Sequence, residues 1–308
     1  EMRKPFPGRL ELIATVLLPG IVVGYLMLLP LLDKKADRGV MKRLPLLVPV
    51  ALFGIAGGIL TGASMKHDAG DADFLKAVAK AEAQAQKALA ISADGVPPDG
   101  ALAMMRNHPE TRRVWLFEQH CASCHRMGDL GPPQGKDTAP DLTGFGSKDW
   151  AKRVLEEPDH DLLFGKTAFK GMMPSMTKPP ADPELAKEFT PMKAEDLNAI
   201  TDFLTAEAQG TTTKDMPGEK LVRQRCTSCH RFDGKTDDEE SLAPELRGWG
   251  STAWVLAQID DPGSGKTYPK GSMDAKLEGH MPAFAEKLSA SDRKLLATFV
   301  QAQAAAKK

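Results

Sequence analysis

The sequence predicts an all-α protein with a two-helix transmembrane hairpin followed by two tandem small helical domains. Two uncharged apolar runs of about 20 residues each lie within residues 1–65. A short motif of two cysteines and a histidine occurs twice in the remaining chain, and similar segments follow each copy. Each series ends in a helix-like stretch, so the second part of the chain is an internal duplication.

Length and charge limit the possible functions. The chain has 308 residues, which suits two or three domains. Its 40 basic and 41 acidic residues give a net charge of −1, which argues against a nucleic-acid partner. The mean hydropathy of −0.29 is that of a soluble protein, but this average combines an apolar start with a polar remainder.

The two apolar runs come first. Residues 12–32 read LIATVLLPGIVVGYLMLLPLL, and residues 44–65 read LPLLVPVALFGIAGGILTGASM. Each approaches the length of about 20 residues that a helix needs to cross the hydrocarbon core. A cleavable signal peptide has one shorter apolar region, and a buried hairpin in a soluble protein rarely lacks charge over such lengths. We therefore expect two membrane spans within residues 1–65.

The loop between the two runs is basic. Its charged residues are Lys34, Lys35, Arg38, Lys42 and Arg43 against Asp33 and Asp37. An excess of positive charge marks the cytoplasmic side of a membrane. We therefore expect a multi-pass protein of a bacterial inner membrane, in contact with membrane lipids, with both termini on the periplasmic side.

A helical linker is expected over residues 66–105. Residues 71–92 are rich in Ala, Lys, Glu and Gln, which favour a surface helix. The Pro and Gly residues of ADGVPPDG then end this helix. The turn-rich stretch QGTTTKDMPG separates the two remaining domains, which we place at residues 106–210 and 211–308.

These two domains are copies of one unit. CASCH ends at His125, and CTSCH ends at His230, about 105 positions later. APDLTGFGSKDW and APELRGWGSTAW follow at a similar offset, and Met-Pro pairs come next at Met173 and Met281. The same parts recur in the same order, which chance explains poorly.

The repeated motif contains all the cysteines of the chain: Cys121, Cys124, Cys226 and Cys229. CxxCH is the attachment motif of c-type haem. Its two thiols can each form a thioether with a haem vinyl group, and His125 or His230 then lies under the iron as the proximal ligand. A disulfide redox pair would need a βαβ context that is missing, and a shared zinc site would leave the Met-Pro pairs unexplained. Two covalently attached haem c groups are therefore expected.

A distal ligand is expected further along each copy. Methionine opposite histidine is the axial pair of electron-transfer cytochromes c, and it raises the potential. Met173 and Met281 share the offset and the following Pro, so they are the predicted distal ligands. The alternatives are nearby methionines, namely Met172, Met176 and Met273, or a role in core packing. His120 and His280 lack counterparts and are expected at the surface.

Pro140 and Pro244 occupy matching positions between the attachment motif and the methionine. A metal-bound histidine commonly donates its second ring N–H to a backbone carbonyl. A loop stiffened by Pro and crossing beneath the ring could supply that carbonyl, although a simple turn is an equally good interpretation. Four aromatic residues are expected to line the haem pockets or to fill the core: Phe145, Trp150, Trp249 and Trp254.

The two carboxy-terminal domains resemble class I cytochromes c in CxxCH, the proline loop, the Met-Pro pair and the final helix. The resemblance implies two tandem cytochrome c-type haem domains. PFPGRLELIATVLLPGIVVGYLMLLPLLD and RLPLLVPVALFGIAGGILTGA resemble the last two membrane helices of cytochrome b, or of the separate subunit four. The Pro-Glu-Trp-Tyr motif of that family would lie upstream of Glu1, so we expect the chain to continue a longer or split polypeptide. Neither span contains a His that could bind a b-type haem.

These resemblances imply a dihaem subunit of a quinol:cytochrome c oxidoreductase, that is, a cytochrome bc complex. The implied partners are a cytochrome b-type membrane subunit, a Rieske iron–sulfur protein and an electron-accepting cytochrome or oxidase. A dihaem subunit of a haem–copper terminal oxidase and a dihaem peroxidase are the alternatives. No nucleophile or acid–base pair stands out, so we expect the chain to conduct electrons rather than to catalyse its own reaction.

Overall fold

The computed structural model describes residues 16–34, 39–93, 95–237, 240, 242–272 and 281–305. Within these ranges the chain forms helices and loops, with two isolated β-bridges and no strand. The chain divides into two compact units, Glu1–Leu89 and Ala90–Lys308. The predicted all-α class is therefore confirmed for the described residues.

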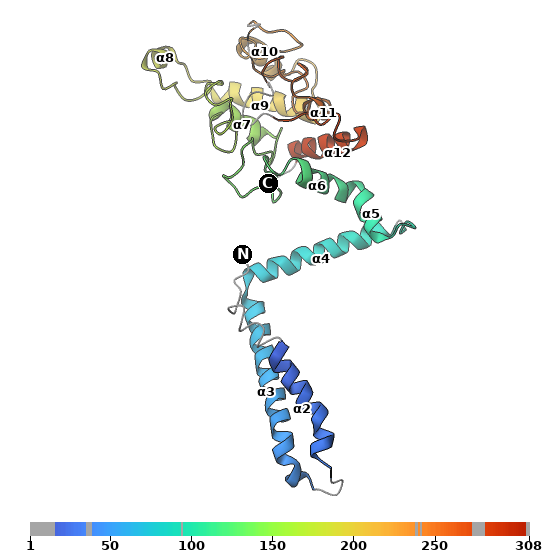
Figure 1. The fold of residues 1–308 in the computed structure, drawn as a ribbon. Helices are drawn as coiled ribbons and strands as arrows, with labels where there is room; N and C mark the ends of the chain where they lie inside the picture. Colours follow the sequence, from blue (N-terminus) through green and yellow to red (C-terminus); the bar gives the residue numbers. More distant parts are fainter. Residues whose placement is uncertain are drawn as a thin grey trace. The chain divides into compact units, whose positions relative to one another are not determined.

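The first unit contains a pair of apolar helices. They are α2 (Leu18–Leu32) and α3 (Val40–Gly70), which run antiparallel and side by side in Figure 1. The Tyr25 hydroxyl on α2 donates a hydrogen bond to the Leu46 carbonyl on α3 at 2.9 Å. This bond satisfies a polar group that lies between two apolar surfaces.

Within the described residues, only α3 is long and apolar enough to cross a membrane. α2 has 15 residues, which span about 22 Å, whereas a hydrocarbon core is about 30 Å thick. The predicted first span began at Leu12, and residues 12–15 lie outside the described part of the chain. The predicted two-span hairpin is therefore not confirmed, whereas one anchoring helix is supported by its length and composition.

The surface helix predicted over residues 71–92 is confirmed as α4 (Ala72–Ser92). The Asp71 carboxylate accepts hydrogen bonds from the backbone N–H groups of Asp73 at 2.9 Å and Phe74 at 3.1 Å. Two amides of the first turn, which lack partners inside the helix, are thereby satisfied. Most side chains of α4 are exposed, so local helix propensity rather than burial accounts for this helix.

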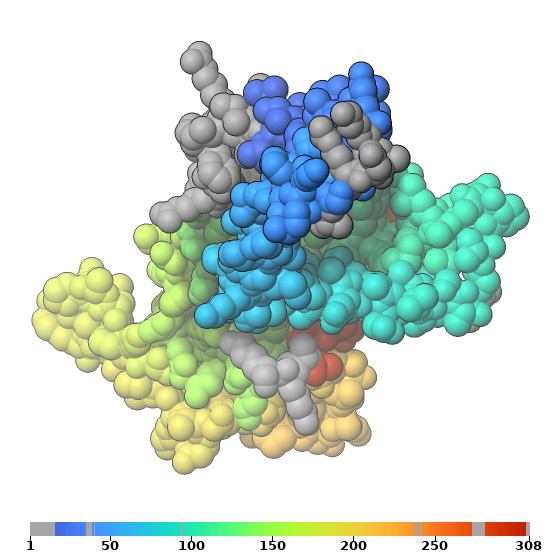
Figure 2. Space-filling view, turned by 90° about the horizontal axis from the view of Figure 1, so that it is seen from below, coloured from blue at the N-terminus to red at the C-terminus, as the bar shows by residue number. Residues whose placement is uncertain are grey.

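The second unit contains both copies of the repeat. The first copy contributes α6 (Pro109–His120), α7 (Lys148–Glu156), α8 (Pro183–Glu188) and α9 (Ala194–Gln209), preceded by α5 (Ala101–Asn107). The second copy contributes α10 (Pro217–Arg225), α11 (Thr252–Asp260), α12 (Ala290–Gln301) and the 3₁₀ helix η2 (Ala302–Ala305). The yellow-green segment that carries α8 projects from the other helices of this unit (Figures 1 and 2).

Corresponding helices of the two copies begin in the same way. The Ser147 hydroxyl at the start of α7 accepts a hydrogen bond from the Trp150 backbone N–H at 3.3 Å, and Ser251 accepts one from Trp254 on α11 at the same distance. The indole N–H of each tryptophan then donates to a backbone carbonyl of its own repeat, at 2.9 and 3.1 Å. The duplication seen in the sequence is therefore also present in local side-chain geometry.

One hydrophobic core runs through both copies. Its most deeply buried side chains include Phe117, Phe203, Phe232, Leu116 and Ile200. The ring of Phe145 lies 5.0 Å from that of Trp150 and 5.3 Å from that of Trp249, between centroids. These three aromatic residues join the two repeats. The boundary between residues 210 and 211 remains a prediction, because the repeats share this core.

The helices of the second unit pair both within and between the copies. α7 packs on α9, and α11 packs on α12, so these two pairs each belong to one repeat. In contrast, α6 packs on α12, and α10 packs on α9. The N-terminal helix of each repeat therefore lies against the C-terminal helix of the other repeat.

Candidate functional site

Both CxxCH motifs begin where a helix ends. Cys121 is the first residue after α6, and Cys226 is the first after α10. One more turn follows in each copy, because the backbone N–H of His125 donates to the Cys121 carbonyl at 2.9 Å and that of His230 to the Cys226 carbonyl at 2.7 Å. This turn brings the two cysteines and the histidine of each motif together.

None of the four cysteines forms a disulfide. Burial, together with the other thiol of the same motif, raises the pKa of Cys121 to about 12 and that of Cys226 to about 11. Disulfide exchange proceeds through thiolates, which these pKa values disfavour at neutral pH. Cys121 and Cys226 are therefore poor attacking thiols for the disulfide redox alternative.

A proline carbonyl orients each motif histidine. His125 Nδ1 lies 2.8 Å from the Pro140 carbonyl oxygen, and His230 Nδ1 lies 3.0 Å from the Pro244 carbonyl oxygen. Donation from Nδ1 leaves Nε2, the opposite ring nitrogen, to bind a metal. The proline loops therefore have the geometry that a supporting role beneath the ring requires, in both copies.

Each proline loop is also tied to the residue that follows its histidine. The backbone N–H of Leu142 donates to the Arg126 carbonyl at 2.8 Å, and that of Leu246 donates to the Arg231 carbonyl at 2.9 Å. The loop and the histidine backbone are thus held together independently of the ring. The position of the carbonyl beneath the imidazole is set by the backbone.

Burial favours the neutral form of both motif imidazoles. It lowers the pKa of His125, although the bond to the Pro140 carbonyl and two nearby carboxylates partly offset the effect. Burial lowers the pKa of His230 in the same way, against the bond to Pro244. A neutral ring retains the lone pair with which imidazole binds iron.

The predicted distal ligands, Met173 and Met281, are half-buried and pack against the core. Met281 Sδ lies 3.9 Å from the side-chain amide nitrogen of Gln258 on α11. Their role as iron ligands remains a prediction, because it depends on the bound haem.

The alternative ligands differ in exposure. Met172 is 56 % exposed, which disfavours it as a ligand in a closed pocket. Met176 is half-buried, and its backbone N–H donates to the Leu155 carbonyl at 2.7 Å. Met273 and His280 lie outside the described residues.

His120 is half-buried, so its expected surface position is only partly met. Its ring centroid lies 6.4 Å from that of Trp115 and 6.1 Å from that of Phe284. Phe284 belongs to the second repeat. The repeat pattern does not predict this contact, because the residue equivalent to His120 in the second copy is Arg225 rather than an aromatic residue.

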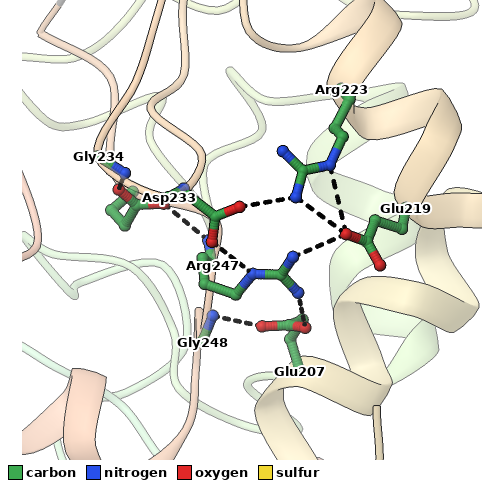
Figure 3. Close-up of polar contacts among 8 residues, drawn as sticks. Glu207, Glu219, Arg223, Asp233, Gly234, Arg247 and Gly248 are labelled. Atoms are coloured by element: carbon green, nitrogen blue, oxygen red, sulfur yellow. Dashed lines mark hydrogen bonds and ion pairs between the residues drawn. The ribbon is translucent and has the colours of Figure 1, made fainter. Parts of the chain in front are cut away.

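A cluster of charges beside the second motif cannot be read from the sequence. Arg247 contacts three carboxylates, those of Glu207 at 3.0 Å, Asp233 at 2.9 Å and Glu219 at 2.7 Å (Figure 3). Arg223 contacts Glu219 at 3.0 Å and Asp233 at 2.6 Å. The five residues come from α9, α10 and two loops, and only the fold brings them together.

The same two arginines cover the ring of Phe232, which follows the second motif. The guanidinium carbons of Arg223 and Arg247 each lie 4.2 Å from its centroid. Burial opposes the charge of Arg247, but hydrogen bonds to Asp233 and Glu219 outweigh burial and raise its pKa. A permanent cation is thereby held next to the second attachment motif.

The residues present fit covalently attached haem. Each copy has two adjacent cysteines that are not joined in a disulfide, a histidine whose Nδ1 contacts a proline carbonyl, and a half-buried methionine. The described His, Cys, Asp and Glu side chains form no group of three or more that could hold a metal ion. The shared zinc site therefore has no matching arrangement in the described part of the chain.

Comparison with known proteins gives one result. The sequence model of the cytochrome c family matches the chain twice, at residues 115–206 and 216–304. Together the two matches cover more than half of the chain, and each includes one CxxCH motif and one Met-Pro pair. No curated protein and no solved structure matches.

Proposed function

Because the chain belongs to the cytochrome c family, we propose that it is a membrane-anchored dihaem subunit of a quinol:cytochrome c oxidoreductase. Its two cytochrome c domains make it an electron-transfer haem protein with covalently bound haem c. In the proposed complex, electrons from quinol oxidation pass through these domains to an acceptor on the periplasmic side.

The duplicated histidine geometry is the main support for electron transfer through two sites. His125 and His230 make the same bond to a proline carbonyl, and both lie in one compact unit. When bound, each haem supplies a one-electron couple at its iron. The cysteines would hold the group, the proline carbonyl orients the imidazole ring, and the apolar core would limit the access of water to the site.

The apolar first unit supports the proposed complex. The side chains of α3 are almost all exposed over a length that can cross a membrane. The basic residues next to this helix favour haem domains on the periplasmic side. The resemblance to cytochrome b helices favours a cytochrome b-type subunit as the membrane partner and a Rieske iron–sulfur protein as the electron donor.

Purification of the full chain in mild detergent tests this proposal. We expect a cytochrome b-type subunit and a Rieske protein to copurify, both b and c haems to be present, and quinol to reduce the c haems. Copurification with a copper-containing oxidase core, without quinol-dependent reduction, would instead identify the subunit of a terminal oxidase.

Peroxide turnover separates a carrier from a dihaem peroxidase. We expect no turnover by the unmodified protein, because the predicted histidine and methionine ligands would leave no open position at either iron for peroxide. The variants Met173→Ala and Met281→Ala each open one iron and serve as matched positive controls. Turnover by the unmodified protein at the level of these variants would contradict a pure carrier.

A further inference from the structure

The two repeats exchange their terminal helices. In the first exchange, the Arg112 guanidinium on α6 forms two bonds to the Asp292 carboxylate on α12, at 2.5 and 2.7 Å. The rings of Phe117 and Phe299 meet edge to face, with centroids 6.2 Å apart. Asp292 is only 8 % exposed, so this contact belongs to the interior.

In the second exchange, α10 of the second repeat lies very close to α9 of the first repeat. A Cβ atom at Gly218 on α10 would lie 2.0 Å from the Ala199 carbonyl oxygen on α9, so only glycine permits this approach. Arg225, at the end of α10, pairs with Asp196 on α9 at 3.1 Å. Since Asp196 and Asp292 hold equivalent places in the two copies, the same exchange occurs twice.

Each methionine segment is hydrogen-bonded to the helix that precedes it in its own repeat. The backbone N–H of Met176 donates to the Leu155 carbonyl on α7 at 2.7 Å, and that of Phe284 donates to the Ile259 carbonyl on α11 at 3.0 Å. Because α7 packs on α9 and α11 on α12, each methionine segment and its two helices form one body. That body packs against the N-terminal helix of the other repeat.

One contact places a methionine segment beside the attachment motif of the other copy. The Phe284 ring, three residues after Met281, lies 6.1 Å from the ring of His120, which immediately precedes Cys121. The same segment continues into α12, which holds α6 through Asp292. The segment that carries Met281 and Phe284 therefore lies near the end of α6, where the first motif begins.

A glycine loop permits this exchange. Gly146 and Gly250 both have left-handed backbone angles, φ 78° and 73°. A Cβ atom at either position would lie within 2.9 Å of the Ala208 Cβ atom. These loops connect the proline segment to α7 or α11, so the chain passes from one half of its repeat to the other at the point where both copies meet.

We propose that the two haem sites exchange their distal ligands. Met281 is the ligand of the iron attached through Cys121 and Cys124, and Met173 is the ligand of the iron attached through Cys226 and Cys229. Each site is then composed of both repeats, and neither copy alone has a complete axial pair.

Pairing within each repeat is the competing arrangement. The loop after α7 touches its own proline loop, because the Asp141 N–H donates to the Leu162 carbonyl at 2.9 Å. This contact lies before Met173 in the chain, whereas the Phe284 contact lies after Met281. The contact of Phe284 with His120 and the packing of the C-terminal helices favour exchange.

Full-length chains that carry one haem distinguish these arrangements. In Cys226→Ala/Cys229→Ala, haem remains at the first motif only. We expect Met281→Ala in this background to abolish the optical band of the Met–iron bond and Met173→Ala to leave it. The reciprocal background, Cys121→Ala/Cys124→Ala, should show the opposite dependence. Loss of the band with Met173→Ala and its retention with Met281→Ala at the first motif would overturn the exchange.

A measurement on the unmodified dihaem protein avoids any effect of the substitutions on folding. In the reduced state, the ligand methyl group of Met281 should show nuclear Overhauser contacts with the haem bonded to Cys121. Contacts with the haem bonded to Cys226 would overturn the exchange. The inference rests on covalent haem at both motifs, as does the proposed function. The intact mass of the protein tests that premise separately. A mass without covalent haem would overturn both the exchange and the proposed function. Attached haem with methionine ligation inside each repeat would overturn the exchange alone.

Discussion

In the first repeat the proximal histidine ring lies 2.8 Å from a proline carbonyl, and in the second repeat the distance is 3.0 Å. The serine caps of α7 and α11 are equally alike, with 3.3 Å in each copy. The surroundings of the two motifs are held by different chemistry. Position 143 of the first copy is Thr, and the matching position of the second copy is Arg247.

This difference changes what supports the proline loop. Thr143 accepts one hydrogen bond from the Gly128 backbone N–H at 2.8 Å. Arg247 instead joins three carboxylates, including that of Glu207, whose side chain is 4 % exposed. The local geometry around the histidine is thus preserved by either a neutral hydrogen bond or a charge cluster. The same contact between histidine and proline carbonyl therefore occurs in different electrostatic surroundings, and these surroundings can give the two haems different reduction potentials.

The helix crossings differ as well. Gly218 allows α10 to approach α9 closely, and the matching residue on α6 is Arg113. The Arg113 guanidinium carbon lies 5.0 Å from the centroid of Phe299 on α12. One crossing therefore depends on the absence of a side chain and the other on a cation over an aromatic ring.

The largest effect is expected at the close crossing. Gly218→Ala should reduce the free energy of unfolding by about 3 kcal/mol, because the added methyl group collides with the α9 backbone. Arg113→Ala should cost less than about 1 kcal/mol, the usual range for an exposed cation–π contact. Urea unfolding of the haem-loaded full chain, followed by circular dichroism, measures both. Equal losses of unfolding free energy in the two variants would contradict the expected difference between the two helix crossings.

Disruption of the Arg247 charge cluster should destabilise the protein more than loss of the Thr143 hydrogen bond. Arg247→Ala leaves the buried Glu207 carboxylate without its cation, so we expect a loss of about 2 kcal/mol, reduced by the partial exposure of the arginine. Thr143→Ala removes one hydrogen bond and should cost about 1 kcal/mol. Redox titration of the two haems adds a second measurement, in which Arg247→Ala is expected to shift the second haem and leave the first unchanged. A shift of the first haem alone would refute the proposed separation.

A double-mutant cycle sharpens the comparison at the first exchange. Arg112→Ala and Asp292→Ala should each destabilise the protein, and their coupling energy should be about 1–2 kcal/mol because the pair is bidentate and partly buried. The cycle Arg225→Ala with Asp196→Ala is the matched control at the second exchange, where a single bond at 3.1 Å predicts weaker coupling. Zero coupling between Arg112 and Asp292 would argue against packing of α6 on α12 in solution.

The smallest effect concerns acid stability. The hydrogen bond from Arg112 lowers the pKa of Asp292 in the folded protein. Such a carboxylate stabilises the fold fully above its unfolded pKa of about 3.9, and this contribution is lost as pH falls through the lower folded pKa. Asp292→Asn and Arg112→Gln should therefore each flatten the fall of the melting temperature below about pH 4. An unchanged acid slope in both variants would contradict this linkage.

The sequence alone predicted the chemistry that depends on short spacing. CxxCH places two thiols and an imidazole within one turn, and the offset between the copies identified the matching Pro140 and Pro244 before their carbonyls were located. The surface helix α4 was also predictable, because its residues favour helix even though most of their side chains are exposed. The first of the two predicted membrane spans was not confirmed, since α2 has 15 residues.

Only the tertiary structure decided which halves of the two repeats lie together. Because the copies share one pattern, either C-terminal helix offers a similar apolar face to either N-terminal helix, and no local rule distinguishes the two pairings. The choice depends on contacts between residues far apart in the chain, such as Arg112 with Asp292 and Gly218 with Ala199. Local spacing determines how each histidine and thiol pair is presented, whereas long-range packing determines which methionine can reach each site.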